Sequence, residues 1–302
     1  MRKVFIATSS FAKNSPAPLE MLKAAGLDVE INPHGRRLSE SEITAFLSDK
    51  EYLIAGTESL TRKVIESAKY LKVISRCGVG MDNVDMEAAK SLGIKVFNTP
   101  DAPTLAVAEL TVGLILDLLR RVSFMDRNIR RGQWQKTMGN LLSGKKVGII
   151  GFGRIGRRTA ELLKNFGCEI AYTDPCKGDE LSGFKCLTLE MLLKWADIIS
   201  LHVSVKDTLI GGDEIRNMKP GAWLVNVSRG GVVDETALHQ ALKNSHLSGA
   251  ALDVFDREPY SGPLTELNNI ILTPHIGSYA KEARVEMELQ AVRNLLMGLG
   301  FE

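Results

Sequence analysis

The chain has 302 residues, which is enough for about two domains and a large buried core. Its 38 Lys and Arg residues nearly balance its 36 Asp and Glu residues, and hydrophobic residues make up 44% of the sequence. This composition is ordinary for a globular protein and gives no sign of a nucleic-acid or membrane partner.

The first third of the chain alternates short apolar runs with helical patterns. Strands are expected at residues 4–8, 28–31, 52–56, 71–75 and 94–97. Helices are expected at residues 19–25, from Ser39 onward, at 61–68 and at 85–91. Ser39 is followed by Glu42 in a capping-box pattern, which marks a helix start. The strict alternation favours a parallel sheet with helices on both faces.

A long apolar helix is expected at residues 105–121, after the helix-start signals Pro100 and Pro103. Leu110, Leu114 and Leu118 belong to a broad apolar stripe. Such a stripe indicates burial on more than one side, as for a helix between domains. The stretch at residues 130–134 is expected to be a surface connection.

The sequence KVGIIGFGRIG at residues 146–156 is the most informative stretch. Its apolar run predicts a strand buried on both faces, and a helix is expected at residues 157–166. Gly151, Gly153 and Gly156 form a G-x-G-x-x-G pattern between them, which in this context predicts a dinucleotide-binding turn. The glycines permit a tight turn, close approach of a pyrophosphate, and close packing of helix on strand. The helix N-terminus offers unpaired amides to the phosphates.

An acidic residue follows the next predicted strand, at residues 169–173. This residue, Asp174, lies about 20 residues beyond the glycines, where a carboxylate accepts hydrogen bonds from a ribose 2′-OH. A carboxylate there would repel a 2′-phosphate. The sequence therefore favours NAD over NADP as the cofactor.

The second half of the chain resumes the alternation. Strands are expected at residues 197–201, 222–227, 250–254 and 270–273, with helices at 187–195 and 234–242. A final helix at residues 280–297 lies past the last strand of this second unit, so it is expected to return to the first. The fold class predicted is α/β with two doubly wound parallel sheets.

Three reactive side chains follow predicted strands of the second unit: Arg229, Glu258 and His275. In doubly wound sheets, ligands bind beyond the carboxyl ends of the strands. Taken singly, these residues also fit a surface arginine, a solvated loop acid and a structural histidine. His202 ends another strand and is expected to line the cofactor site.

Together the three residues suit hydride transfer to a 2-keto acid, for which a nicotinamide supplies the hydride. His275 would give the carbonyl oxygen its proton, since histidine exchanges protons near neutral pH. Glu258 would orient the imidazole and favour its protonated form. Arg229 would hold the substrate carboxylate through two parallel hydrogen bonds and polarise the carbonyl.

The cysteines and the N-terminal sequence indicate a cytoplasmic protein. No two cysteines form a C-x-x-C pair, and their spacing fits free thiols in a reducing compartment better than a zinc site. No metal site is therefore expected. The N-terminus enters a strand without a long apolar region, so no signal peptide is expected. The cysteines are Cys77, Cys168, Cys176 and Cys186.

Several motifs resemble the signatures of the D-isomer-specific 2-hydroxyacid dehydrogenases. They are GFGRIG at residues 151–156, VSRGGVVDE at 227–235, ALDVF at 251–255 and TPHIG at 273–277. RCGVGMDNVD at residues 76–85 and NTP at 98–100 are similar to the phosphoglycerate dehydrogenase branch of this family. The resemblance covers essentially the whole chain.

This resemblance implies a catalytic set, a cofactor site and a substrate loop. Arg229, Glu258 and His275 would be catalytic, and the backbone of the substrate loop would receive the substrate carboxylate. The substrate loop consists of Cys77, Gly78, Val79 and Gly80. Besides the three glycines, the residues around NAD would be Arg154, Ile155, Asp174, His202, Val203, Val227, Ser228, Asp253 and Gly277.

The resemblance also implies a domain organisation. Residues 1–98 and 277–302 would form a discontinuous, flavodoxin-like substrate domain. Residues 99–276 would form a Rossmann-type NAD-binding domain through which two copies associate as a homodimer.

The first expectation for the substrate is 3-phosphoglycerate, oxidised to 3-phosphohydroxypyruvate in serine biosynthesis. Phosphoglycerate dehydrogenases carry a basic residue where this chain has Gly56-Thr57-Glu58, although Arg36 and Arg37 offer a substitute.

Three other functions fit parts of the sequence. One is a hydroxypyruvate or glyoxylate reductase. Another is an NAD-sensing regulator similar to the corepressor relatives, which can keep the catalytic residues. A Rossmann methyltransferase would leave the positions of Arg229, Glu258 and His275 unexplained.

Overall fold

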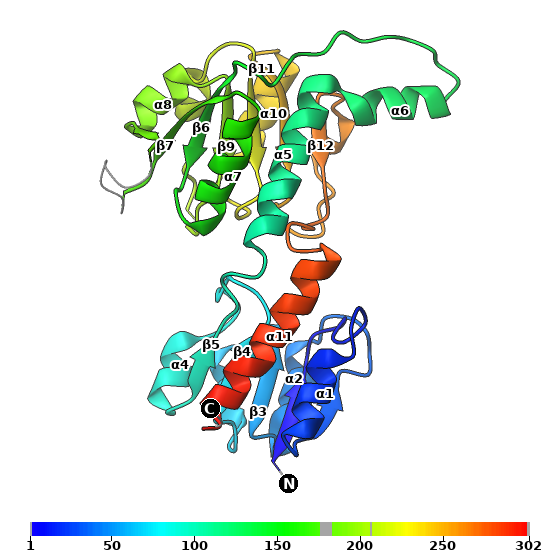
Figure 1. The fold of residues 1–302 in the computed structure, drawn as a ribbon, viewed down its shortest axis with the longest axis vertical. Coiled ribbons are helices and arrows are strands. Elements are labelled where there is room, and N and C mark those ends of the chain that lie inside the picture. Colours follow the sequence, from blue (N-terminus) through cyan, green and yellow to red (C-terminus); the bar gives the residue numbers. More distant parts are fainter. Residues whose placement is uncertain (1, 176–182, 206, 301–302) are drawn as a thin grey trace. The chain divides into compact units, whose positions relative to one another are not determined.

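The computed structural model describes residues 2–175, 183–205 and 207–300; Cys176 lies outside this part. The chain divides into two compact units, each with its own sheet (Figure 1). Unit 1 comprises Met1–Pro103 and Ser278–Glu302, and unit 2 comprises Thr104–Gly277. The predicted fold class, two doubly wound parallel sheets, is confirmed.

Unit 1 contains a five-stranded parallel sheet in the order β2-β1-β3-β4-β5, which is the flavodoxin-like order. Its strands are β1 (Lys3–Ile6), β2 (Asp28–Ile31), β3 (Tyr52–Ala55), β4 (Val73–Arg76) and β5 (Lys95–Phe97). Its helices are α1 (Ala17–Ala24), α2 (Glu40–Phe46), the 3-10 helix η1 (Leu47–Asp49), α3 (Arg62–Ser67), α4 (Met86–Ser91) and α11 (Lys281–Gly298).

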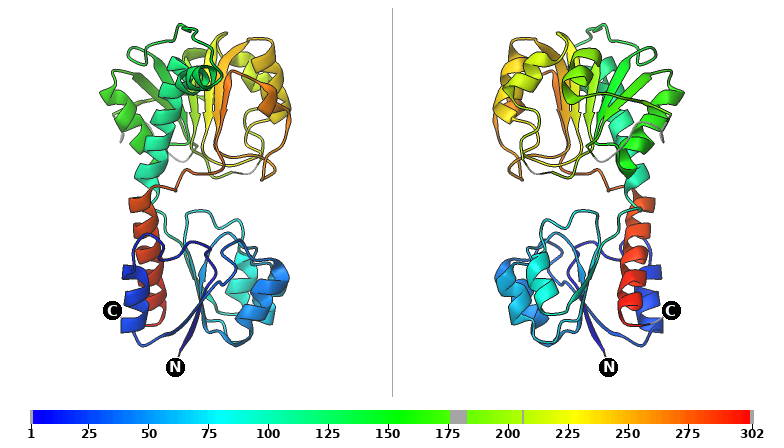
Figure 2. Two further views of the ribbon diagram at one scale, coloured as in Figure 1. Left: turned by 90° about the vertical axis from the view of Figure 1, so that its right-hand side faces the viewer. Right: turned by 90° about the vertical axis from the view of Figure 1, so that its left-hand side faces the viewer.

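Both faces of this sheet are buried, which explains why its central strands are almost entirely apolar. Val4 and Ile6 of β1 pack toward α1 and α11, whereas Phe5 packs toward the helices of the other face. Figure 2 shows α1 and α11 on one side of the sheet and α2, α3 and α4 on the other. The last helix thus belongs to the core of unit 1, where it packs on β3, β4 and β5.

The predicted capping box at the start of α2 is confirmed. The Ser39 hydroxyl accepts a hydrogen bond from the Glu42 amide, and the Glu42 carboxylate accepts one from the Ser39 amide at 2.8 Å. These bonds satisfy amides that a helix start otherwise leaves unpaired.

Unit 2 contains a seven-stranded parallel sheet in the order β12-β11-β10-β9-β6-β7-β8. Its strands are β6 (Lys146–Ile150), β7 (Glu169–Thr173), β8 (Lys185–Cys186), β9 (Ile198–Leu201), β10 (Ala222–Asn226), β11 (Leu247–Leu252) and β12 (Ile270–Leu272). The chain order reverses between β6 and β9, and the strands on either side follow the Rossmann arrangement. The crevice at such a reversal is where these sheets bind dinucleotides.

Helices cover both faces of this sheet as well. They are α5 (Thr104–Arg120), α6 (Val122–Arg130), α7 (Arg154–Asn165), α8 (Leu189–Trp195), α9 (Gly212–Asn217), α10 (Glu235–Lys243) and the 3-10 helix η2 (Pro263–Glu266). The long helix α5 packs against α7, β10, β11 and β12. Within the described residues, none of the helices has the length and hydrophobicity that a membrane span requires.

Four elements of unit 2 were not predicted: β8, α6, α9 and η2. Each is short, and β8 has only two residues. Helix α6 begins after Arg121, whose left-handed backbone (φ 54°) separates it from α5. Its apolar residues Val122, Met125 and Ile129 stand at helical spacing, so the periodic signal was present in the sequence and was overlooked.

Candidate active site

The glycine turn between β6 and α7 has two glycines that the fold itself requires. Gly151 has φ +88°, and a Cβ there would lie 2.5 Å from the carbonyl oxygen of His202. A Cβ on Gly156 would lie 2.1 Å from the carbonyl oxygen of Gly151. Larger residues would therefore force the turn, the strand and the helix apart.

Gly153 differs, because a Cβ there would meet no atom of the described residues within 4 Å. It is the N-cap of α7, which begins at Arg154, earlier than the predicted start at residue 157. Open space therefore lies over the backbone at the N-terminus of a helix of 12 residues. This geometry fits a pyrophosphate group, which binds to unpaired amides at a helix start.

Asp174 lies directly against this turn. Its Oδ2 accepts a hydrogen bond from the Phe152 amide at 2.7 Å. The Phe152 ring stacks on Tyr172, with 3.9 Å between ring centroids, and this packing fixes the segment further. The acid predicted to recognise the ribose is thus attached to the turn predicted to hold the phosphates.

His202 directly follows β9 beside the glycine turn and is half-buried. Its Nε2 lies 2.9 Å from the Ser200 hydroxyl, and its Nδ1 has no hydrogen-bond partner within the described part of the chain. Burial lowers the pKa of His202 to about 3, so its imidazole is neutral at physiological pH. His202 is therefore suited to lining the cofactor site and not to donating a proton.

Glu258 and His275 form a directly paired acid and imidazole. His275 Nδ1 lies 3.0 Å from Glu258 Oε2, and Glu258 Oε1 accepts a hydrogen bond from the Phe255 amide at 3.2 Å. One carboxylate oxygen is thus held by backbone and the other orients the imidazole. Because Nδ1 is used in this pair, proton exchange with a substrate falls to Nε2.

Asp253, which is fully buried, holds the loop that carries His275. Its Oδ1 accepts hydrogen bonds from the Thr273 hydroxyl at 2.6 Å and the Ile276 amide at 2.8 Å. Its Oδ2 accepts one from the Gly277 amide at 2.8 Å. His275 has φ 54°, a conformation that costs energy in a non-glycine residue and persists where the surroundings enforce it. This positioning role was not predicted, although an acid at the end of an apolar strand was the available signal.

The turn that carries Arg229 is organised by Asn226, the last residue of β10. The Asn226 side chain accepts hydrogen bonds from the amide and the hydroxyl of Ser228 and donates one to the Arg229 carbonyl oxygen at 2.9 Å. A Cβ on Gly230 would lie 1.8 Å from the Phe255 carbonyl oxygen, so this turn packs on the segment before Glu258. Sequence analysis missed Asn226, whose signal was a buried amide ending an apolar strand.

The three predicted catalytic residues thus follow three adjacent strands. Arg229 follows β10, Glu258 follows β11 and His275 follows β12, and these strands pair in parallel. Their carboxyl ends form one edge of the sheet, on which the three residues gather.

The predicted substrate loop of unit 1 follows β4 and is also fixed by short-range contacts. Arg76 Nη1 donates to the Cys77 carbonyl oxygen at 3.0 Å and occupies the space of a Gly78 side chain. The Gly78 amide donates to the Thr99 hydroxyl at 2.8 Å, so it is already used inside the protein. Burial raises the pKa of the Cys77 thiol to about 11, which keeps it uncharged.

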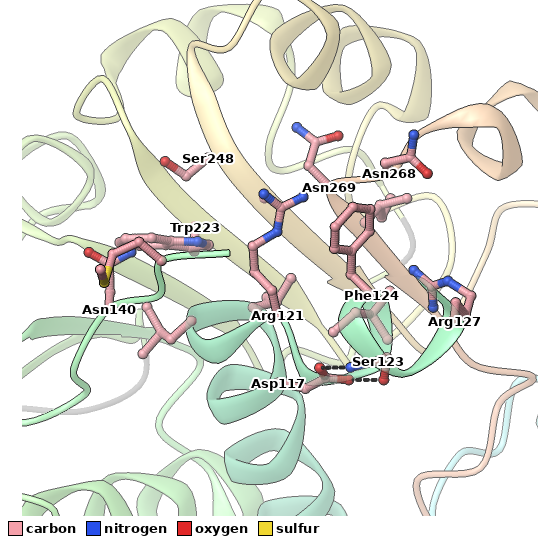
Figure 3. Close-up of a pocket in the computed structure, with 16 residues that line it drawn as sticks. Asp117, Arg121, Ser123, Phe124, Arg127, Asn140, Trp223, Ser248, Asn268 and Asn269 are labelled. Carbon is pink, nitrogen blue, oxygen red and sulfur yellow. Dashed lines mark hydrogen bonds between the residues drawn. The ribbon is translucent and has the colours of Figure 1, made fainter. Parts of the chain in front are cut away.

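A cavity of about 190 Å³ in unit 2 lies at the opposite end of the sheet (Figure 3). Its lining includes Trp223 and Ile270, which lie at the amino ends of β10 and β12. Asp117 on its wall accepts hydrogen bonds from the amide and the hydroxyl of Ser123. The cavity is therefore separate from the catalytic edge. The residues described include no cluster of His, Cys, Asp and Glu that could hold a metal ion.

The chain belongs to the D-isomer-specific 2-hydroxyacid dehydrogenase family. The model of this family's NAD-binding domain matches residues 112–277. A solved structure from Thermus thermophilus has a TM-score of 0.92 and 37% identity, covering 99% of this chain and 97% of that one. The protein is thus an NAD-dependent oxidoreductase acting on D-2-hydroxy acids.

Three similar proteins are named as enzymes that act on different substrates. The glyoxylate reductase of Thermococcus litoralis is 43% identical over 80% of this chain and 77% of its own length. The D-3-phosphoglycerate dehydrogenase of Methanocaldococcus jannaschii is 42% identical over 82% of this chain and 49% of its own length. The hydroxypyruvate reductase of Thermotoga maritima is 34% identical over 95% of this chain and 97% of its own length.

The two glycines of the turn provide a matched test of the cofactor site. Gly153→Ala should weaken NADH binding while changing the free energy of unfolding by no more than about 1 kcal/mol, since only the helix cap is affected. Gly156→Ala should lower the free energy of unfolding by about 1–3 kcal/mol, because its Cβ overlaps the Gly151 carbonyl. NADH fluorescence titration and denaturant unfolding measure the two effects. Unchanged NADH affinity in Gly153→Ala would argue against pyrophosphate binding at this turn.

A second prediction concerns cofactor choice. Asp174→Asn keeps an acceptor for the Phe152 amide but removes the charge that would repel a 2′-phosphate. The ratio of kcat/KM with NADH to kcat/KM with NADPH should fall about 10-fold or more. Asp213→Asn, an exposed site of unit 2, is the matched control. An unchanged ratio in Asp174→Asn would mean that another group selects the cofactor.

Proposed function

We propose that this enzyme reduces a short 2-keto acid that carries no phosphate, either glyoxylate or hydroxypyruvate, with NADH as the reductant. The observation that carries the proposal is the charge at the carboxyl edge of unit 1. The loop after β3 reads G-T-E-S at residues 56–59 and offers a carboxylate where a phosphate would need a cation.

The two arginines that could bind a phosphate instead, Arg36 and Arg37, already bind other side chains of unit 1. Arg36 forms two hydrogen bonds with the Glu42 carboxylate, at 2.6 and 3.0 Å. These bonds and the Ser39 amide hold the pKa of Glu42 well below its usual range, so the pair is ionised at neutral pH. Arg37 donates to the Ser59 hydroxyl at 2.9 Å. A phosphate would have to compete with these contacts.

The pairing of His275 with Glu258 in unit 2 supports the catalytic roles proposed here. The turn at residues 151–156 and Asp174 would hold NADH, which would supply the hydride for the carbonyl carbon of the substrate. His275 gives a proton from Nε2 to the carbonyl oxygen, while Glu258 holds the imidazole through Nδ1. Arg229 binds the substrate carboxylate and polarises the carbonyl.

Oxidation of 3-phosphoglycerate is the second candidate. It is favoured by the phosphoglycerate dehydrogenase relative and by the motif at residues 76–85. Following NADH loss with glyoxylate, hydroxypyruvate and phosphohydroxypyruvate separates the two proposals. Preference for the phosphorylated acid would favour the second.

We further propose that two copies associate through unit 2. The stretch from α6 to residue 141 exposes several large apolar side chains, and Trp134 and Met138 are 84% and 93% exposed. Several large exposed apolar side chains within one segment are typical of an interaction surface. The other exposed apolar side chains of the stretch are Val122, Ile129 and Leu141. A cytoplasmic location and the absence of nucleic-acid and membrane partners remain predictions from the sequence.

The role of His275 is testable by substitution. His275→Ala should lower kcat about 10²–10⁴-fold, because it removes the proton donor, and should leave the Kd for NADH nearly unchanged. His239→Ala, in α10 of the same unit, should change neither quantity. Steady-state kinetics and NADH titration measure the two. Parallel loss of turnover and NADH binding would mean that His275 is structural.

The proposed dimer is testable by a charge on its apolar surface. Met138→Asp should convert a dimer into a monomer, because it buries a carboxylate at the interface. Met191→Asp, at an exposed methionine of α8, should leave the dimer intact. Light scattering coupled to size exclusion measures the mass. A monomeric wild type, or a dimeric Met138→Asp variant, would contradict the proposal.

A further inference from the structure

Glu258 lies in an exposed part of the loop between β11 and β12. Residues 256–259 are all exposed, and the Glu258 side chain is 40% exposed. Its carboxylate contacts the Phe255 amide through one oxygen and His275 Nδ1 through the other. A long side chain at such a position keeps several conformations unless its surroundings restrict it. The conformation of this loop therefore decides how well Glu258 faces the imidazole.

Two stacked aromatic rings fix the loop on either side of Glu258. The rings of Phe255 and Tyr260 lie 4.5 Å apart between centroids, with 23° between their planes. Phe255 is only 8% exposed and belongs to the core of unit 2, against which Tyr260 also packs. Stacked aromatic pairs stabilise a structure beyond the area they bury. The stack joins the residue three positions before Glu258 to the residue two positions after it and so constrains the segment between them.

The Tyr260 hydroxyl anchors the ring at its other end. It accepts a hydrogen bond from the Leu264 amide at 3.2 Å, and Leu264 is fully buried in η2. A Cβ on Gly262 would lie 2.4 Å from the hydroxyl oxygen, so glycine leaves room for the ring at this point. Burial raises the pKa of Tyr260, which is therefore uncharged at neutral pH. The ring is thus held by both packing and a hydrogen bond.

A second contact holds the loop from helix α10. Glu235, the first residue of α10, accepts a hydrogen bond from the Asp256 amide through Oε1 at 2.8 Å. A charged acceptor makes such a bond stronger than a neutral one would. Helix α10 packs on β11, the strand that this loop follows. The bond therefore ties the residue next to Phe255 to a rigid element of unit 2.

We propose that Tyr260 and Glu235 are positioning residues, which hold the loop of Glu258 in the conformation that pairs its carboxylate with His275. The proposal rests on the proposed function, in which this pair orients the imidazole for proton transfer. Neither residue has to touch the substrate or the cofactor for this role. A small displacement of a catalytic group lowers the rate strongly, because proton transfer requires hydrogen-bond distance.

The first test compares two substitutions of Tyr260 in the whole chain. Tyr260→Ala removes the stack and should lower kcat about 10-fold, while the Kd for NADH stays nearly unchanged. Tyr260→Phe keeps the ring and loses only the hydroxyl, so its kcat should stay within about 3-fold of the wild type. Steady-state kinetics with glyoxylate, hydroxypyruvate and phosphohydroxypyruvate, together with NADH fluorescence titration, measure these quantities.

Glu235→Ala gives an independent measurement if Tyr260→Ala folds poorly. It should lower kcat about 5-fold, because it removes the acceptor of the Asp256 amide. Glu235→Gln keeps an oxygen that can accept this bond and should restore most of the turnover. Glu190→Ala is the matched control, since Glu190 also lies in the first turn of a helix of unit 2 but pairs with Lys194. This control should leave kcat unchanged.

Coupling to Glu258 separates positioning from a general effect on the fold. In a Glu258→Ala background the pair with His275 is already lost, so adding Tyr260→Ala or Glu235→Ala should lower kcat by less than about 2-fold more. Full losses in that background, or wild-type kcat in both single variants, would overturn the positioning role. Unchanged kcat in Glu258→Ala, or a wild type that turns over none of the acids, would overturn the proposed function, and the positioning role with it.

Discussion

Parallel pairing of strands buried on both faces is the constraint on which the rest of this structure depends. A parallel sheet directs the carboxyl ends of all its strands to one edge, and the helices on both faces leave that edge as the place for polar side chains. In unit 2 the residues that follow β10, β11 and β12 are therefore neighbours, although 46 positions separate Arg229 from His275 in the sequence. The proximity of the three loops that carry the predicted catalytic residues is thus a consequence of topology.

The topology places each loop at the edge of the sheet but does not fix the conformation of the loop. Buried polar side chains at the strand ends fix it through hydrogen bonds. Asp253 accepts three hydrogen bonds from the loop that holds His275, and Asn226 makes three with the turn that holds Arg229. Burying a carboxylate or an amide costs free energy unless its hydrogen bonds are satisfied. Such a group is therefore stable only where the neighbouring loop places hydrogen-bond partners around it. The hydrogen bonds that offset the cost of burying these groups also hold the loops of His275 and Arg229 in position.

The sequence allowed prediction of the features that depend on local pattern. Apolar runs, capping residues and the glycine spacing identified most strands and helices and the turn between β6 and α7. The catalytic set and the cofactor contacts remain predictions. Helix α9 was missed because its six residues include only one buried apolar side chain, Ile215, whereas α6 was missed although its apolar residues stand at helical spacing. The roles of Asn226 and Asp253, and the pairing of Arg36 with Glu42, depend on which loop lies opposite which side chain. That information arises only when the chain is folded, so composition and spacing could not supply it.

Discrimination among substrates must come from groups other than the catalytic set. Glyoxylate, hydroxypyruvate and phosphohydroxypyruvate share the carboxylate and carbonyl that Arg229 and His275 would contact, and they differ only at C3. A group that distinguishes them has to differ in charge and hydrogen-bonding capacity where C3 lies. At the carboxyl edge of unit 1, Arg36 is neutralised by Glu42, and the loop after β3 carries Glu58 and no cation. A carboxylate repels a phosphate dianion, and a low local dielectric strengthens this repulsion. The proposed preference for an acid without a phosphate rests on this charge pattern, whereas the hydride and proton transfers are the same for all three acids.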